Sequence, residues 1–200
     1  MCGRFATTMA VATWLLHVPA AAQPDLPFNR VRAIDARARE ILLDAWNSSP
    51  TVRALVETLE GSDLIVQVET QAVGASFRAR LRFVTAAPGC RFVRVSVKVP
   101  APRRVAIPAL AHELQHAVEI SQANDVVDEE TLIGLFRRIG RQWERGVSVF
   151  ETEAALAVEA RVGLELRVEG KRRDSHEVEA LAPHLPPGFR PALQSVHEPR

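Results

Sequence analysis

The stretch IPALAHELQHAVEI, residues 107–120, decides how the fold of this chain is interpreted. A helix over this stretch would place His112, Glu113 and His116 on one side and apolar residues on the opposite side. Because few charges interrupt the apolar positions, the helix is predicted to be buried. Ionisable side chains in a buried helix need partners, since leaving them unpaired costs on the order of a few kcal/mol.

The spacing of the two histidines is that of a metal site. Residues four apart lie one turn apart on the same helical face, so His112 and His116 can offer imidazole nitrogens to one ion. Glu113 lies one position further round the helix and can reach a water on that ion. A metal would satisfy all three side chains. The alternative is an ordinary α+β domain in which other side chains satisfy the histidines.

Length and composition indicate a single globular domain. The chain has 200 residues, of which 47% are apolar, and a formal charge of +1. This length suffices for one domain with a sizeable core, whereas two domains would be cramped. The near-zero charge gives no reason to expect a nucleic-acid partner, which normally requires a basic surface.

Residues 1–22 have the pattern of a secretory signal peptide. One arginine precedes an apolar run at 5–18, and the small residues at 20–22 form an Ala-x-Ala cleavage site. The alternative is a buried amino-terminal helix. The apolar run is shorter than the ~20 residues that a membrane span needs, so no stable membrane span is expected. The mature chain, 23–200, is therefore expected to be secreted or periplasmic. It would retain Cys90 alone, which excludes an internal disulfide.

Amphipathic periods predict helices on both sides of the motif. These helices cover residues 29–46, 50–60, 129–139 and 150–166. Ser49 is expected to cap the second of them and Asp128 the third. The domain is expected to span 23–169, followed by a tail, 170–200, that is rich in proline and charge.

Three strands are predicted between the second helix and the motif, where the hydrophobic period changes to two. They cover 64–69, 76–84 and 91–99, and Pro88-Gly89 forms a turn between the last two. The expected fold is α+β, with a small antiparallel sheet of about three strands packed on helices. One sheet face is apolar and the other carries arginines, which either meet an acidic partner or are neutralised by glutamates such as Glu69.

The motif resembles the HExxH signature of the zincin metallopeptidases. Within these, a metzincin would have glycine at 119 and histidine at 122, where this chain has Glu119 and Gln122. The resemblance is therefore to the gluzincin group, in which a later helix supplies a glutamate as third metal ligand. It implies a zincin-like fold around a metal-bearing helix, with Zn²⁺ as the cofactor.

The segment VFETEAALAVEA, 149–160, resembles the Glu-x-x-Ala-Asp pattern that supplies the third ligand in several gluzincins. Glu151 takes the ligand place and Ala154 matches the alanine, with Glu153 as the alternative ligand. Ala155 replaces the aspartate that usually orients a metal-bound histidine. One of three acidic residues is expected to take the place of that aspartate, namely Asp125, Asp128 or Glu153.

The implied activity is an exported zinc-dependent metallopeptidase that cleaves a peptide or protein substrate. A zinc-activated water would attack the peptide bond, with Glu113 as general base, and an edge strand of the sheet would pair with the substrate. The chain contains no tyrosine, so His176, His184 or an arginine would have to stabilise the oxyanion. The alternative is a catalytically inactive zincin-like module for metal binding or protein interaction.

Overall fold

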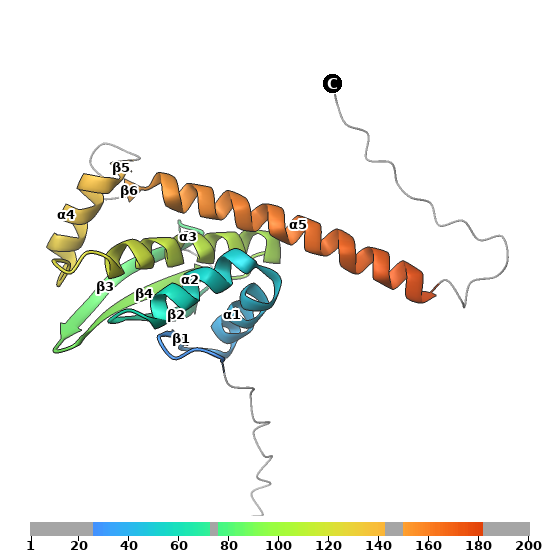
Figure 1. Ribbon diagram of the computed structural model, residues 1–200, viewed down its shortest axis with the longest axis horizontal. Helices are drawn as coiled ribbons and strands as arrows, with labels where there is room; N and C mark the ends of the chain where they lie inside the picture. Colours follow the sequence, from blue (N-terminus) through green and yellow to red (C-terminus); the bar gives the residue numbers. More distant parts are fainter. Residues whose placement is uncertain (1–25, 73–75, 143–149, 182–200) are drawn as a thin grey trace, which may run out of the picture.

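In the computed structural model of the protein, residues 26–72, 76–142 and 150–181 are described, so the predicted signal peptide lies outside the description (Figure 1). The helices in these ranges are α1 (Ala36–Ser48), α2 (Pro50–Glu60), α3 (Arg103–Ser121), α4 (Glu129–Ile139) and α5 (Glu153–Leu181). The strands are β1 (Val31–Ala33), β2 (Leu64–Gln71), β3 (Ala79–Ala87), β4 (Cys90–Lys98), β5 (Arg141–Gln142) and β6 (Phe150–Glu151). The predicted α+β class is confirmed.

The main sheet is mixed and has four strands in the order β1-β2-β4-β3, so the predicted three-stranded antiparallel sheet is wrong. β3 and β4 form the expected hairpin, in which Gly89 adopts a φ of 80° that suits glycine in the turn. β4 then inserts between β2 and β3 and runs parallel to β2. Strand order depends on contacts between distant segments, and the period-two pattern contains no information about it.

The fourth strand comes from a segment that was predicted to be helical. Val31 pairs with Val66 in a parallel ladder, and α1 begins only at Ala36. Asp35 accounts for the break, because its carboxylate accepts hydrogen bonds from the backbone N–H groups of Ala38, as an N-cap, and of Thr70 in β2. One side chain thus starts the helix and attaches its first turn to the sheet.

The predicted caps of the other helices are confirmed. Ser49 accepts from the backbone of Val52 at the start of α2, where Pro50 is the first helical residue. Asp128 and Thr131 form a capping box at the start of α4.

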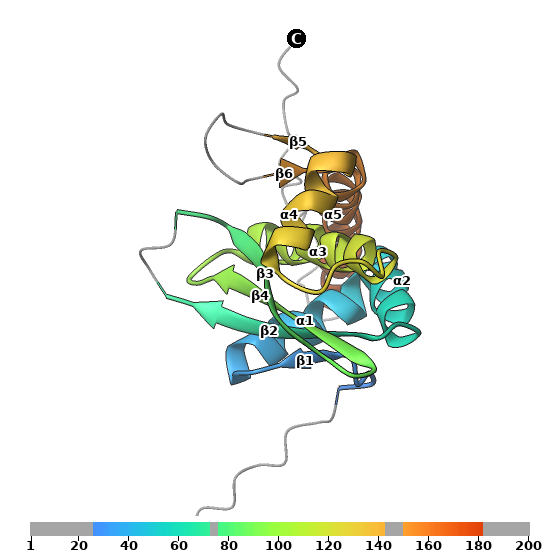
Figure 2. The same ribbon diagram turned by 90° about the vertical axis from the view of Figure 1, so that its left-hand side faces the viewer.

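α3 lies at the centre of the molecule, between the sheet and α5. It contacts β2, β3 and β4 on one side and α5 on the other, while α1 and α2 pack beside it (Figures 1 and 2). The sheet presents a fully buried valine face to this layer, formed by Val66, Val68, Val93, Val95 and Val97. Burial on both sides explains why the sequence of α3 is apolar almost all round.

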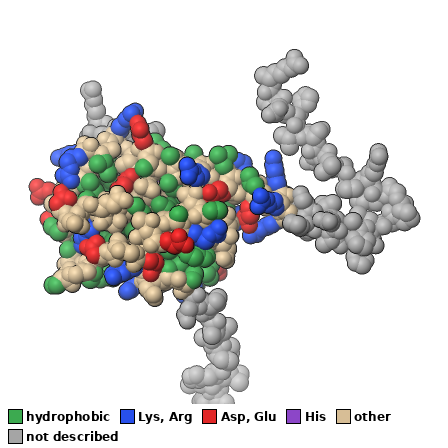
Figure 3. All heavy atoms as spheres, in the orientation of Figure 1, with side chains coloured by type: hydrophobic (Ala, Val, Ile, Leu, Met, Phe, Trp, Pro, Cys, Tyr) green, Lys and Arg blue, Asp and Glu red, His purple; other side chains and the backbone are tan. Residues whose placement is uncertain are grey.

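The opposite sheet face is partly neutralised within the chain. Glu69 lies 3.7 Å from the guanidinium of Arg94 and accepts a hydrogen bond of 2.7 Å from Ser96. The guanidinium of Arg80 lies 4.9 Å from the centre of the Phe77 ring. On the face shown in Figure 3, acidic and basic side chains are interspersed rather than gathered into one patch.

α5 differs from its predicted bounds at both ends. It begins at Glu153, after the two-residue strand β6, and it continues to Leu181, past the end predicted at residue 166 and beyond the rest of the fold (Figure 1). No helix in the described ranges is both long enough and apolar enough to cross a membrane. Cys90 is a free, partly exposed thiol.

Candidate metal centre

The motif lies in the buried middle of α3, as predicted. As whole residues, His112, Glu113 and His116 are 6%, 9% and 5% exposed. Phe136 of α4 packs edge-on against the ring of His116, with 4.9 Å between the ring centres. The centre is therefore formed where α3 meets α4 and the start of α5.

Three potential ligand atoms converge at this point. His112 Nε2 lies 2.8 Å from Glu151 Oε2 and 3.1 Å from His116 Nε2, and the ligand atoms of the three residues all lie within 4.8 Å of one another. Ligands of a tetrahedral zinc ion, with bonds of about 2.0–2.1 Å, lie roughly 3.3 Å apart. This buried His/His/Glu group could hold a metal ion.

Glu151 reaches the group from β6, one position before the residue that caps α5, and not from the helix as predicted. The hydroxyl of Thr152 accepts a hydrogen bond of 3.1 Å from the backbone N–H of Ala155, which is the N-cap arrangement. Ala155 in the first turn of α5 is fully buried, whereas Ala154 and Ala157 are exposed.

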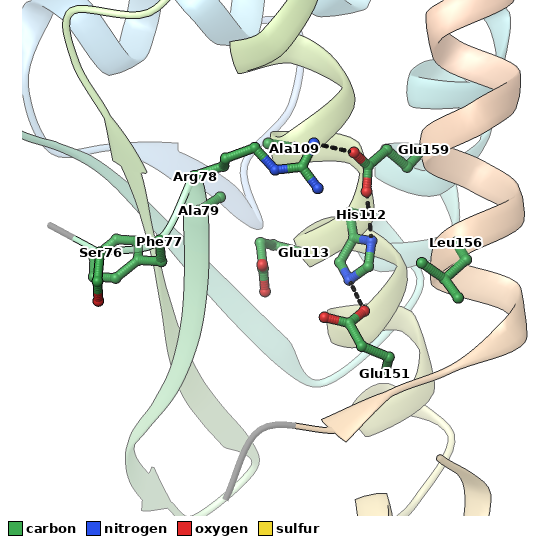
Figure 4. A pocket seen from close by; sticks show the side chains of 10 residues that line it. All are labelled: Ser76, Phe77, Arg78, Ala79, Ala109, His112, Glu113, Glu151, Leu156 and Glu159. Atoms are coloured by element: carbon green, nitrogen blue, oxygen red, sulfur yellow. Dashed lines mark hydrogen bonds and ion pairs between the residues drawn. The ribbon is translucent and has the colours of Figure 1, made fainter. Parts of the chain in front are cut away.

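Each histidine meets a second carboxylate through its other nitrogen. His116 Nδ1 lies 2.8 Å from Glu119 Oε2, and His112 Nδ1 lies 3.1 Å from Glu159 Oε2 (Figure 4). A carboxylate accepts hydrogen bonds, so the contact with Glu119 favours the tautomer of His116 that carries the proton on Nδ1. The Nε2 atom of His116 then directs a lone pair toward His112 Nε2, which lies beside Glu151.

Two buried polar atoms of this group, Glu151 Oε2 and His112 Nδ1, make no hydrogen bond to any of the described residues. They lie 2.8 Å from His112 Nε2 and 3.1 Å from Glu159 Oε2, respectively. Lone pairs that face one another repel unless a proton or a cation lies between them. The donor set therefore fits a metal ion.

The charges of the group shift its pKa values in a consistent way. Burial acts to lower the pKa of His112, but Glu151, Glu113 and Glu159 outweigh it and raise the pKa. The contact with His112 lowers the pKa of Glu151. Burial raises the pKa of Glu113, against the opposing effect of the two histidines.

Two adjoining hollows of about 420 and 410 Å³ are both lined by His112, Glu113 and Glu151. These volumes are typical of ligand pockets. The first hollow also contains Arg78 and Glu159, and Figure 4 shows the guanidinium beside the Glu159 carboxylate, which lies next to His112. The second is lined by apolar side chains, namely Leu81, Leu132, Ile133, Phe136 and Phe150, and also by Arg80, Arg82 and Glu129.

The end strand of the main sheet, β3, borders both hollows. Phe77, just before β3, and Ala79, its first residue, line both of them. The backbone N–H of Leu81 in this strand donates to the carboxylate of Glu113. The general-base candidate is therefore held directly against the edge strand.

The acidic residues that were expected to orient the histidines contact other parts of the molecule instead. Asp125 pairs with Arg138, Asp128 caps α4, and Glu153 is exposed and pairs with Arg141 at 2.7 Å. Glu153 therefore lies outside the group that the structure brings together. His176 falls within α5, where the side chain is not described, and His184 lies outside the described residues.

Glu119 and Glu159 were missed as partners of the histidines. Glu119 follows His116 by three positions, which places it on the same helical face, and this spacing was a usable signal. Glu159 has no such signal, because its contact with His112 depends on how α5 packs on α3. No family model, curated protein or solved structure matches this chain.

Proposed function

We propose that this protein is a zinc-dependent metallopeptidase in which His112, His116 and Glu151 bind the metal and Glu113 is the general base. The observation that carries the proposal is the buried convergence of the three ligand atoms at the floor of an open cleft. Glu113 lies beside them, next to the edge strand. The HExxH spacing and the resemblance to gluzincins support the same conclusion.

Zinc fits the donor set better than calcium or magnesium does. Two imidazoles and one carboxylate are the protein ligands of many catalytic zinc sites, whereas calcium and magnesium prefer oxygen ligands alone. Bound zinc would supply a Lewis acid and lower the pKa of a coordinated water toward neutrality. The cleft supplies the space for substrate that a purely structural zinc site lacks.

Glu113 is placed to move protons during hydrolysis. Burial raises the pKa of its carboxyl group, which brings it nearer to the working pH of a general base. Its carboxylate would take a proton from the attacking water and deliver it to the leaving amine. Glu113 lines both hollows, so its carboxyl group is within reach of a substrate bound there.

The substrate would bind as an extended peptide along β3. This strand ends the main sheet, so one of its edges is available for pairing with another chain, and it borders both hollows. The apolar second hollow would accept a large hydrophobic side chain beside the scissile bond. Residues 1–22 have the pattern of a signal peptide, so the proposed peptidase would be exported.

Glu113→Gln tests the proposal most sharply because it keeps the shape of the side chain but removes its basicity. The variant is expected to bind zinc like the wild type and to lose hydrolysis of a fluorogenic peptide library by about 10²-fold or more. Glu57→Gln, at an exposed position of α2 that lines neither hollow, is the matched control and should retain activity. Unchanged turnover in Glu113→Gln would contradict the proposed role, and zinc binding with no cleavage by the wild type would favour the inactive metal-binding module.

A further inference from the structure

A buried chain of hydrogen bonds links the two segments that supply the candidate ligands. His116 Nδ1 contacts Glu119 Oε2 at 2.8 Å, and the hydroxyl of Thr152 donates to Glu119 Oε1 at 2.7 Å. The same hydroxyl oxygen accepts from the backbone N–H of Ala155. The side chains of His116 and Glu119 are 7% and 10% exposed and Thr152 is 3% exposed, so water has little access to this chain.

The chain of hydrogen bonds from His116 through Glu119 to Thr152, called the bridge below, matters for the candidate metal site because of where Thr152 lies. Thr152 directly follows Glu151 and caps α5, so its side chain helps to determine where the Glu151 backbone lies relative to α3. Glu119 meanwhile fixes both the ring orientation and the tautomer of His116. The Glu119 carboxylate therefore connects His116 on α3 with the segment that carries Glu151, although His116 and Glu151 lie 35 positions apart in the sequence.

We infer that Glu119 and Thr152 are positioning residues, which hold His116 and Glu151 at the separation that metal binding requires. This inference rests on the proposed metal site, and it extends it to two residues outside the HExxH and Glu-x-x-Ala patterns. Without the bridge, the His116 ring can rotate or change tautomer, and β6 can shift relative to α3. Both changes separate the ligand atoms and weaken metal binding.

Three variants of the full chain test the bridge. Thr152→Val keeps the shape but removes the hydroxyl, Glu119→Gln replaces one accepting oxygen by a donor, and Thr152→Ser keeps the hydroxyl. Zinc affinity is measured by competition with a chelator, and the visible absorption of the Co²⁺-loaded protein reports the ligand geometry. Thr152→Val and Glu119→Gln should each lower zinc affinity about 10–100-fold and alter the Co²⁺ spectrum. Thr152→Ser should restore both to nearly the wild-type values.

Glu165→Gln is the matched control. Glu165 is also a partly buried carboxylate that links α5 to another helix, accepting from the hydroxyls of Ser49 at 2.5 Å and Thr51 at 2.6 Å. It lies roughly 18 Å along α5 from Glu153, the first residue of that helix. This variant should lose stability while keeping the zinc affinity and the Co²⁺ spectrum of the wild type.

The outcomes separate this inference from the proposed function. Zinc binding by the wild type, with equal affinity in Thr152→Val and Glu119→Gln, would overturn the positioning role alone. An equal loss of affinity in Glu165→Gln would also overturn it, because the effect would then be one of general stability. A wild type that binds neither Zn²⁺ nor Co²⁺ would overturn the proposed function together with the inference.

Discussion

His112 and His116 are each held through Nδ1 by a glutamate, and each glutamate is held in turn by a further residue. Thr152 donates to Glu119, and Arg78 donates to Glu159 at 2.5 Å. The two arrangements differ in burial, because Thr152 is enclosed while the Arg78 side chain is 64% exposed at the cleft. An exposed cation beside the centre is available to a substrate.

Under the proposed function, Arg78, which lines the first hollow beside His112, is our candidate for stabilising the oxyanion. Arg78→Ala is expected to lower kcat by about 10²-fold with zinc still bound, because a donor for the developing oxyanion is lost. Arg78→Lys should recover part of the rate. Steady-state kinetics on a cleaved peptide, together with zinc content, would measure both effects.

Arg37→Ala is the matched control for Arg78→Ala. Arg37 is also an exposed arginine with one carboxylate partner, Glu40 at 2.7 Å. This variant should leave kcat unchanged. A wild-type kcat in Arg78→Ala would show that another group stabilises the oxyanion.

At the scale of elements, the carboxyl end of α3 is held by a buried arginine. Arg91 of β4 donates to the backbone carbonyls of Ile120, Ala123 and Val126, which lie at the end of the helix and just beyond it. Its guanidinium also forms a bidentate pair with Asp63, at 2.8 and 2.7 Å. This contact ties the end of α3 to the sheet.

The Arg91–Asp63 pair is expected to make the stability of the fold depend on pH. Hydrogen bonds from Arg91 lower the pKa of Asp63 below its ordinary value of 3.8, against a smaller opposing effect of burial. A lowered pKa in the folded state stabilises the fold above the unfolded value, and this contribution is lost as the pH falls below about 3.8 toward the folded pKa. Asp63→Asn should therefore be less stable than the wild type at neutral pH, and the difference should narrow in acid.

Urea unfolding of both proteins between pH 7 and pH 3 measures this difference. EDTA should be present throughout, so that proton-linked loss of metal does not contribute. A difference in unfolding free energy that stays constant down to pH 3 would contradict the assigned role of the pair.

Local patterns predicted the elements that local chemistry determines. Ser49, Pro50 and Asp128 start helices by contacts within one turn, and these positions could be identified from the sequence. Asp35 could not be interpreted in the same way, because its second partner, Thr70, lies 35 residues away. The parallel pairing of β2 with β4 escaped prediction for the same reason.

At the scale of the whole molecule, the candidate centre was predictable where it is a short motif and not where it depends on packing. Residues 112–116 and Glu151 were identified from spacing and resemblance. The start of α5 after Glu151, and the approach of Glu159 to His112, depend on how two helices cross. The site lies where α3, α4, β3 and the start of α5 meet, so its geometry belongs to the complete fold.

The most direct measurement is the zinc content of the purified chain beside that of a His112→Ala variant. We expect about one zinc per wild-type chain and almost none in the variant, because removing one of three protein ligands leaves too few to hold the ion. Absence of zinc from the wild type after dialysis against the metal would contradict the central claim. The two histidines would then be held by Glu119, Glu151 and Glu159 alone.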